Sequence, residues 1–238
     1  MRYKKTVLAV LIFLFVLLTA SCGKDERIPI NKTVADLLSE EKATNCSVVS
    51  LGDYSSFTVS VNSPKVTAKE YNENFTEETK GYGDLTEDFV RTEFGFGTID
   101  EFKKDVDRRY LEHLKVLQIL SAREKIITYL LGIAQFDLSD DDIAEVSKQM
   151  VYKEQNYAVL YGYETFDDYL REELNLSEEQ FLQKCYAQAE NEVKKCLLIG
   201  AIAERENVVV PDGEDIYATY QDLENAVYEL FMDVDSDF

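Results

Sequence analysis

The chain has 238 residues, of which 45% are hydrophobic, and its 25 Lys and Arg residues are outnumbered by 46 Asp and Glu residues, giving a net charge of −21. This acidity argues against nucleic acid as a partner, because phosphate binding requires clustered Lys and Arg. The hydrophobic share is sufficient for one large or two small domains, and the low counts of three prolines and ten glycines favour long helices.

The first 22 residues have the layout of a bacterial export signal. A basic start precedes an apolar run of 12 residues, from 7 to 18, and small residues then lead to Cys22. Such a run is shorter than the roughly 20 residues of a membrane-spanning helix. The pattern resembles a lipobox, although Thr19 stands where Leu or Val is preferred. We expect residues 1–21 to be a lipoprotein signal peptide and Cys22 to carry lipid; an ordinary secretory signal and an uncleaved anchor are the alternatives.

Lipidation of Cys22 implies a location for the protein. Two or more acyl chains on one cysteine hold a protein stably at a membrane, which predicts an anchor on the extracytoplasmic face of the cell membrane. Loss of the signal removes three basic residues and leaves a net charge of 22 − 46 = −24. Such a body repels anionic headgroups only within a Debye length of about 10 Å. Residues 22–45 are polar, include Pro29 and are expected to form a tether with one helical turn near Val34.

A small β element and a linking helix are predicted for residues 46–82. Apolar residues from Val48 precede a Gly52-Asp53 turn, and alternation of apolar and polar residues resumes around Val59. This pattern predicts a two-stranded hairpin. A lone hairpin is marginally stable, so we expect its apolar side to pack on the helices that follow.

Recurrent capping boxes mark the helix starts. In a capping box a Ser or Thr side chain accepts a hydrogen bond from the N3 amide, and the N3 side chain reaches back. Full or weaker boxes occur at Thr67 with Glu70, Thr98 with Glu101, Ser139 with Asp142, Thr165 with Asp168, and Ser177 with Gln180. The predicted helices are 98–133, an antiparallel pair at 139–160 and 177–206, a short helix at 165–173, and a last helix at 212–231, with 217–238 forming an acidic C-terminal helix or tail.

Together these signals predict a mainly α fold with a small β hairpin. The long helix over 98–133 would extend about 50 Å. Followed by an antiparallel helical pair, it favours an extended shape that bears an arm, and one compact bundle is the alternative.

Three cysteines follow the anchor: Cys46, Cys185 and Cys196. Cys185 and Cys196 lie in one predicted helix, about 16 Å apart along its axis, so they cannot form a disulfide with each other. We expect all three to be small buried hydrophobic residues; a disulfide to Cys46 and a redox role are the alternatives.

Three stretches carry a family resemblance: GDLTEDFVRTEFGFGTIDEFKKDV from Gly83, FDLSDDDIAEV from Phe136, and LSEEQFLQKCYAQAENEVKKCLLIGAIAERENVVV from Leu176. In order, spacing and helix edges they resemble the C-terminal domain of bacterial trigger factor. LGDYSSFTVSVNSPKVTAKEY from Leu51 is similar to the segment that leads out of the ribosome-binding domain of that family. The resemblance implies an elongated, multi-helix, SurA-like arm architecture over 83–216.

The chain also departs from the family pattern. In the family an FKBP-type isomerase domain comes next, whereas only residues 72–82 separate the flanking segments here, and the Gly-Phe-Arg loop for ribosome docking is missing. We therefore expect no isomerase activity and no ribosome as partner. The family continues into a second arm after the position of Ile216, so half of the cradle is expected to be missing or to come from another molecule, as in a homodimer.

No recognisable catalytic or metal-binding pattern occurs in the sequence. His113 stands without a nucleophile or metal partner, and the acidic run at 140–142 is placed to offset a helix dipole. The run at 233–237 lacks the turn glycine and final Glu of an EF-hand. We expect a protein that is not an enzyme and that needs no metal or cofactor.

An aromatic cluster at the tip of the helical pair is the candidate client-binding site. Aromatic and Met side chains make adaptable contacts with unfolded segments. The cluster comprises Met150, Tyr152, Tyr157, Leu160, Tyr161, Tyr163, Phe166 and Tyr169. The alternative is that these side chains pack the arm helices together.

The resemblance and the anchor together suggest a membrane-anchored, extracytoplasmic, ATP-independent holdase chaperone for unfolded or newly exported proteins. A lipoprotein adaptor or scaffold that binds one folded partner at the cell surface is the other hypothesis. Broad, weak suppression of aggregation would favour the chaperone, and one tight partner would favour the adaptor.

Overall fold

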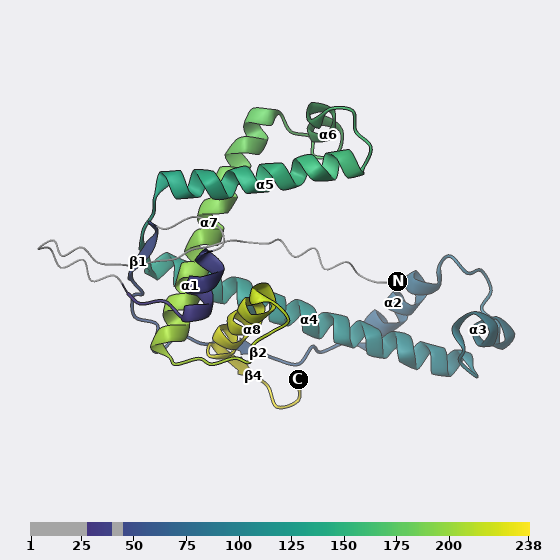
Figure 1. Ribbon diagram of the computed structural model, residues 1–238. Coiled ribbons are helices and arrows are strands. Elements are labelled where there is room, and N and C mark those ends of the chain that lie inside the picture. The colour runs from purple at the N-terminus through teal and green to yellow at the C-terminus, as the bar shows by residue number, and fades with distance from the viewer. Residues whose placement is uncertain (1–27, 40–44) are drawn as a thin grey trace, which may run out of the picture. The chain divides into compact units, whose positions relative to one another are not determined.

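The computed structural model describes residues 28–39 and 45–238 (Figure 1). The predictions for the signal peptide and for Cys22 fall outside these residues. The described elements, in chain order, are α1 Lys32–Ser39, β1 Ser47–Ser50, β2 Val59–Val61, α2 Ala68–Thr79, α3 Glu87–Phe94, α4 Ile99–Ile133, β3 Gln135–Asp137, α5 Asp140–Leu160, α6 Phe166–Glu172, α7 Glu178–Arg205, α8 Ile216–Glu229 and β4 Met232–Val234. The mainly helical fold class is thereby confirmed.

The chain divides into two compact units. The described part of unit 1 comprises residues up to Phe57 and Ile127–Leu230, and unit 2 comprises Thr58–Ile126 and Phe231–Phe238. Helix α4 therefore contributes its last turns to unit 1 and the rest to unit 2.

The predicted hairpin is wrong, although both of its strands exist. β1 pairs antiparallel with β3, with Val48 opposite Phe136, and β2 pairs in parallel with β4. The connection between β1 and β2 is not a tight turn, because it has its own core residues, Leu51 and Tyr54. Gly52 adopts a φ of +67°, and a Cβ there would lie 2.7 Å from the Ile133 carbonyl oxygen, so the chain runs closely past the end of α4.

Helix caps largely follow the predicted boxes. Both hydrogen bonds of the box form at Thr67 and at Ser177, which start α2 and α7. At the start of α4, Thr98 accepts from the Glu101 amide (3.1 Å), but the Glu101 carboxylate accepts from the amide of Gly97 (2.8 Å), one residue earlier than a capping box requires. Helix α3 is capped by Thr86, whose N3 residue is Phe89. No box marks that start, and the helix was not predicted.

Unit 1 is built around the second half of α7. Its buried side chains lie on every face of the helix, since five neighbouring residues are at most 1% exposed: Leu197, Leu198, Ile199, Ala201 and Ile202. Helices α1 and α8 pack against this half, and α5 and α6 pack against α7 as well. The helix ends at Arg205. Asn207, two residues later, has a φ of +55°, and the amide of Val208 donates to the Ala203 carbonyl (2.9 Å), as in a Schellman motif.

Unit 2 has an aromatic core between α2, α3 and the first half of α4. Val90, Phe102 and Val106 are buried there. The rings of Phe94 and Phe102 stack with their centroids 4.5 Å apart, and Phe75 meets Phe102 edge to face. The C-terminal residues of the chain belong to this unit, where β4 forms a strand that had been predicted as helix or tail.

The three described cysteines are free and buried, which confirms the expectation of small buried hydrophobic residues. Burial raises the pKa of the Cys46 thiol to about 11. Cys196 is fully buried and its thiol donates to the Tyr220 hydroxyl (2.8 Å). These thiols are held protonated, in an environment unlike that of a reactive cysteine.

Candidate functional site

Helices α5, α6 and the start of α7 form an arm within unit 1, and the end of this arm has a core of its own (Figure 1). Its buried residues are Ala158, Tyr169, Leu170, Phe181 and Cys185. The chain turns from α5 towards α6 at Gly162, whose φ is +83°, a conformation that favours glycine. The arm end is thus folded around aromatic side chains from α6, α7 and the turn after α5, and α5 itself supplies Ala158.

Hydrogen bonds fix the aromatic side chains of the arm core. The Tyr169 hydroxyl donates to the Glu154 carboxylate (2.9 Å), and the Tyr163 hydroxyl donates to Glu173 (2.5 Å). Burial, together with the Glu154 bond, raises the pKa of Tyr169 to about 12, so the hydroxyl remains a donor at neutral pH. The arm end is therefore a pre-organised support for whatever lies on its surface.

The eight predicted site residues divide between support and surface. Met150, Tyr163 and Phe166 are partly buried against the arm core, of which Tyr169 is a member. Tyr157 is half-buried. The side chains at the surface are Tyr152 (67% exposed), Leu160 (78%) and Tyr161 (72%). Part of the predicted set therefore packs the arm helices together and the rest lies at the surface, where client binding stays a prediction.

Val159 joins this surface and was not predicted. It is 74% exposed and lies seven residues after Tyr152, two helical turns along the same face of α5. We define the arm-tip patch as Tyr152, Val159, Leu160 and Tyr161. The seven-residue spacing from Tyr152 is the signal in the sequence that points to Val159, whereas the aromatic and Met content of the arm does not.

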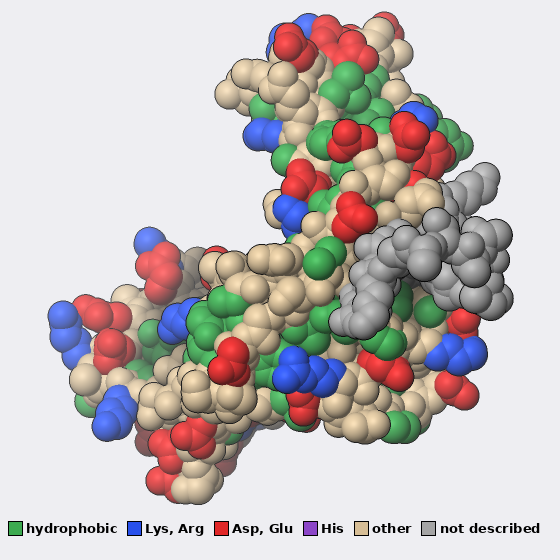
Figure 2. Space-filling view, turned by 90° about the vertical axis from the view of Figure 1, so that its left-hand side faces the viewer, with side chains coloured by type: hydrophobic (Ala, Val, Ile, Leu, Met, Phe, Trp, Pro, Cys, Tyr) green, Lys and Arg blue, Asp and Glu red, His purple; other side chains and the backbone are tan. Residues whose placement is uncertain are grey.

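Acidic side chains surround the arm-tip patch. Residues 150–182 contain eight Asp and Glu and only two basic residues, Lys153 and Arg171, so their net charge is 2 − 8 = −6. Arg171 is engaged by Asp167, Asp168 and Glu172. The hydrogen bond from Thr165, and then Arg171, lower the pKa of Asp168, which stays ionised at neutral pH. Figure 2 shows acidic side chains gathered among apolar ones over the arm, in its upper part.

A second exposed apolar surface lies on α4, in unit 2. Val116, Leu117 and Leu120 are about half exposed. They lie beyond the part of α4 that the aromatic core of unit 2 covers. We call them the α4 stripe; their exposure depends on tertiary packing, which the helical period does not reveal.

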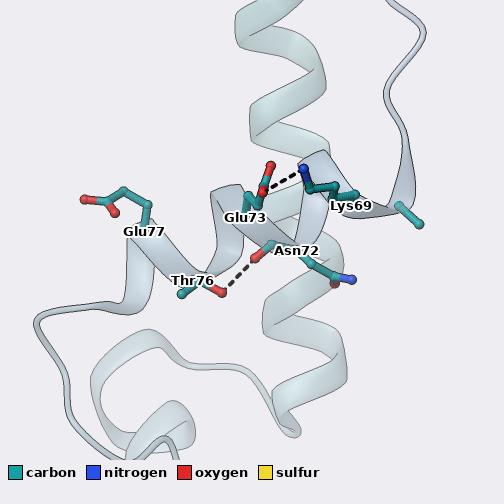
Figure 3. Close-up of a pocket in the computed structure, with 6 residues that line it drawn as sticks. Lys69, Asn72, Glu73, Thr76 and Glu77 are labelled. Carbon is teal, nitrogen blue, oxygen red and sulfur yellow. Dashed lines mark hydrogen bonds and ion pairs between the residues drawn. The ribbon is translucent and has the colours of Figure 1, made fainter.

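A shallow depression lies along α2 (Figure 3). Its lining comes from one face of that helix: Ala68, Lys69, Asn72, Glu73, Thr76 and Glu77. Lys69 pairs with Glu73 (3.4 Å), Thr76 donates to the Asn72 carbonyl (2.8 Å), and Glu77 pairs with Lys80. The polar groups are thus engaged within the helix, and nothing in the depression is arranged for chemistry.

Asp142, in the acidic run that begins α5, has a structural role. It is buried and accepts hydrogen bonds from the Asn45 amide (2.7 Å) and from the hydroxyl of Ser139 (3.1 Å), so it holds the Ser139 cap of α5 and ties Asn45 to the start of that helix. Within residues 28–39 and 45–238 there is no group of three His, Cys, Asp or Glu side chains placed to hold a metal ion. In the same residues no helix combines the length and apolar character needed to cross a membrane.

Comparison with known families identifies the arm. The family described as bacterial trigger factor protein (TF) C-terminus matches residues 98–230, which is more than half of the chain. The chain belongs to this family. No curated protein and no solved structure matches it. The match begins at the cap of α4 and ends after α8, so it contains the arm-tip patch and the α4 stripe. Family membership implies chaperone-like binding of unfolded polypeptides.

Proposed function

We propose that this protein is a lipid-anchored, extracytoplasmic holdase that binds unfolded or newly exported polypeptides without ATP and without enzymatic activity. The observation that carries the proposal is the arm-tip patch, in which four apolar side chains, each more than 65% exposed, stand on a hydrogen-bonded support within a trigger factor C-terminal domain. The export pattern ending at Cys22 supports the location.

The patch is suited to weak and reversible binding. A fully buried large apolar side chain contributes about 1.5–3 kcal/mol, and a client covers each side chain only in part. Association also costs several kcal/mol in lost freedom. Four side chains therefore suffice for transient contacts of low affinity, and the surrounding acidic residues keep the complex soluble.

An adaptor for one folded partner is the second candidate function. The same patch, with its two tyrosines, would then be the centre of a specific interface. The two functions differ in selectivity: a holdase suppresses the aggregation of unrelated clients at molar excess, whereas an adaptor leaves them to aggregate and yields one tight partner.

The test measures light scattering while a chemically denatured, unrelated protein is diluted into buffer with the form that begins at Gly23. The variants are Tyr152→Ser with Leu160→Ser, and the matched control is Val209→Ser, which removes a largely exposed apolar side chain outside the arm. We expect the wild type and control to suppress scattering and the double variant to require several-fold more protein. Absence of suppression by the wild type would refute the holdase, and faster proline-limited refolding would refute the absence of isomerase activity.

A further inference from the structure

Helix α1 is docked on unit 1, although it belongs to the stretch that the sequence predicts as a tether. The amide of Asn31 donates to the Gly200 carbonyl (2.8 Å), and the amide of Ile28 donates to the Val48 carbonyl (3.1 Å). Val34 is fully buried, and a Cβ on Gly200 would lie 2.9 Å from the Cβ of Val34. Real side chains do not approach so closely, so α1 is seated where α7 has no side chain.

The docked segment is also ordered locally. The Asn31 side chain accepts from the Thr33 amide (2.8 Å) and the Ala35 amide donates to the Asn31 carbonyl (2.9 Å), so Asn31 caps α1. The helix contacts both α7 and α8, and Figure 1 shows it beside these two helices. Two hydrogen-bonded attachments, a cap and a buried valine thus fasten the chain from Ile28 onwards.

We propose that docked α1 shortens the free linker between the membrane anchor and unit 1. We call α1 the clamp, and the chain between Cys22 and the first attachment to unit 1 the leash. The inference rests on the proposed lipidation of Cys22. From Cys22 to Ile28 the chain has six residue steps, which span at most about 21 Å. Without the clamp, the first attachment would be at Asn45, whose amide donates to Asp142, after 23 steps. That longer leash would span up to about 80 Å, with a root-mean-square length near 26 Å for a flexible chain.

A short leash places the protein where exported chains leave the membrane. The net charge of −24 opposes an anionic surface, but the leash is about two Debye lengths long, so salt screens most of this repulsion. The lipid surface is thus the partner that α1 brings close to unit 1, and release of α1 extends the reach of the protein.

The chain offers a clean test of the clamp. Gly200→Ala improves the helix propensity of α7 by about 1 kcal/mol while it drives a methyl group into Val34. Gly132→Ala is the matched control, because Gly132 also lies in a helix and a Cβ there meets nothing within 4 Å. Val34→Asp releases α1 by a second route, since it places an unpaired carboxylate in a fully buried position.

The measurement is energy transfer from the protein to dansyl lipid in vesicles. Cys22 of residues 22–238 is coupled to a maleimide lipid, which the three buried cysteines do not react with readily. The chain has no tryptophan, so Val209→Trp, at a largely exposed position of unit 1, supplies a single donor. We expect strong transfer in the wild type and Gly132→Ala, and at least a twofold loss in Gly200→Ala and Val34→Asp.

Hydrogen exchange of the amides of Asn31, Thr33 and Ala35, which are hydrogen-bonded when α1 is docked, reports in the same samples whether α1 is released. Equal transfer in wild type and released variants, or fast exchange of these amides in the wild type, would overturn the clamp. Because the lipid is attached chemically, neither result depends on natural acylation. Acylation is tested separately by the mass of the protein purified from membranes, and holdase activity by the scattering assay.

Discussion

Phe181 lies in the arm core that supports the arm-tip patch. Its removal therefore tests the contribution of the core while the exposed patch residues stay unchanged. It is 6% exposed and lies in the arm core, where its ring meets Phe166 edge to face with centroids 5.4 Å apart. A Phe→Ala change in a core costs about 3–5 kcal/mol, of which the ring pair accounts for about 1 kcal/mol. We expect Phe181→Ala to cost about 4 kcal/mol. The arm core is a cluster distinct from the residues that bury the second half of α7, so the loss is local.

Hydrogen exchange with mass spectrometry measures this prediction. A loss of 4 kcal/mol corresponds to about a thousandfold faster exchange of the α6 amides. The α8 amides should change far less. Leu182→Ala is the matched control, because its side chain is half-exposed and adjacent on α7; it should cost less than about 1 kcal/mol. An increase below tenfold in α6, or an equal increase in α8, would refute the reasoning. The variant should also lose holdase activity, although all four patch residues remain.

Two further predictions concern the polar contacts between α7 and α8. Lys195 pairs with the buried Glu224 (2.5 Å), so Glu224→Leu alone should lower the free energy of unfolding by about 3–5 kcal/mol. The double variant Lys195→Met with Glu224→Leu should recover most of this loss, because neither charge is then buried without its partner. Urea denaturation measures both free energies, and equal losses in the single and double variants would contradict this prediction. Burial raises the pKa of Glu192, despite the opposing effect of Lys195, so the folded state favours the protonated acid. Ionisation of Glu192 therefore destabilises the fold at pH values above the ordinary pKa of a glutamate. Glu192→Gln should stabilise the protein at pH 7, and this gain in the free energy of unfolding should vanish as the pH falls below the ordinary pKa. A gain that does not change with pH would contradict the prediction.

The helix starts were predictable because capping is local. Thr67 and Ser177 carry their signal within four residues, and α2 and α7 begin where that signal places them. The pairing of the strands was not predictable, because β3 and β4 lie far from β1 and β2 in the sequence and are only three residues long. Alternation identifies a strand but leaves its neighbour open, and the hairpin hypothesis chose the nearest candidate.

In the candidate site, too, local features could be predicted from the sequence and tertiary contacts could not. The composition of the sequence locates the aromatic residues of the arm, but tertiary packing decides which of them are exposed. Tyr169 is buried in the arm core, whereas Tyr161 is exposed in the arm-tip patch. The side chains of Tyr152 and Val159 share a face that is visible in the helical period, whereas exposure of the α4 stripe depends on where other helices end. Sequence patterns thus identify the arm, and tertiary packing separates its support from its surface.

The family match and the folded units have different boundaries, and the reason is physical. The match begins at residue 98, yet Phe102 and Val106 of α4 are buried by Val90 and Phe75, which precede it. It ends at residue 230, yet β4 follows and pairs with β2. The segments that flank the match therefore complete the core of unit 2. On this view the short stretch at 72–82, where the family inserts its isomerase domain, is part of the structure that covers α4, since Phe75 lies in it and packs on Phe102.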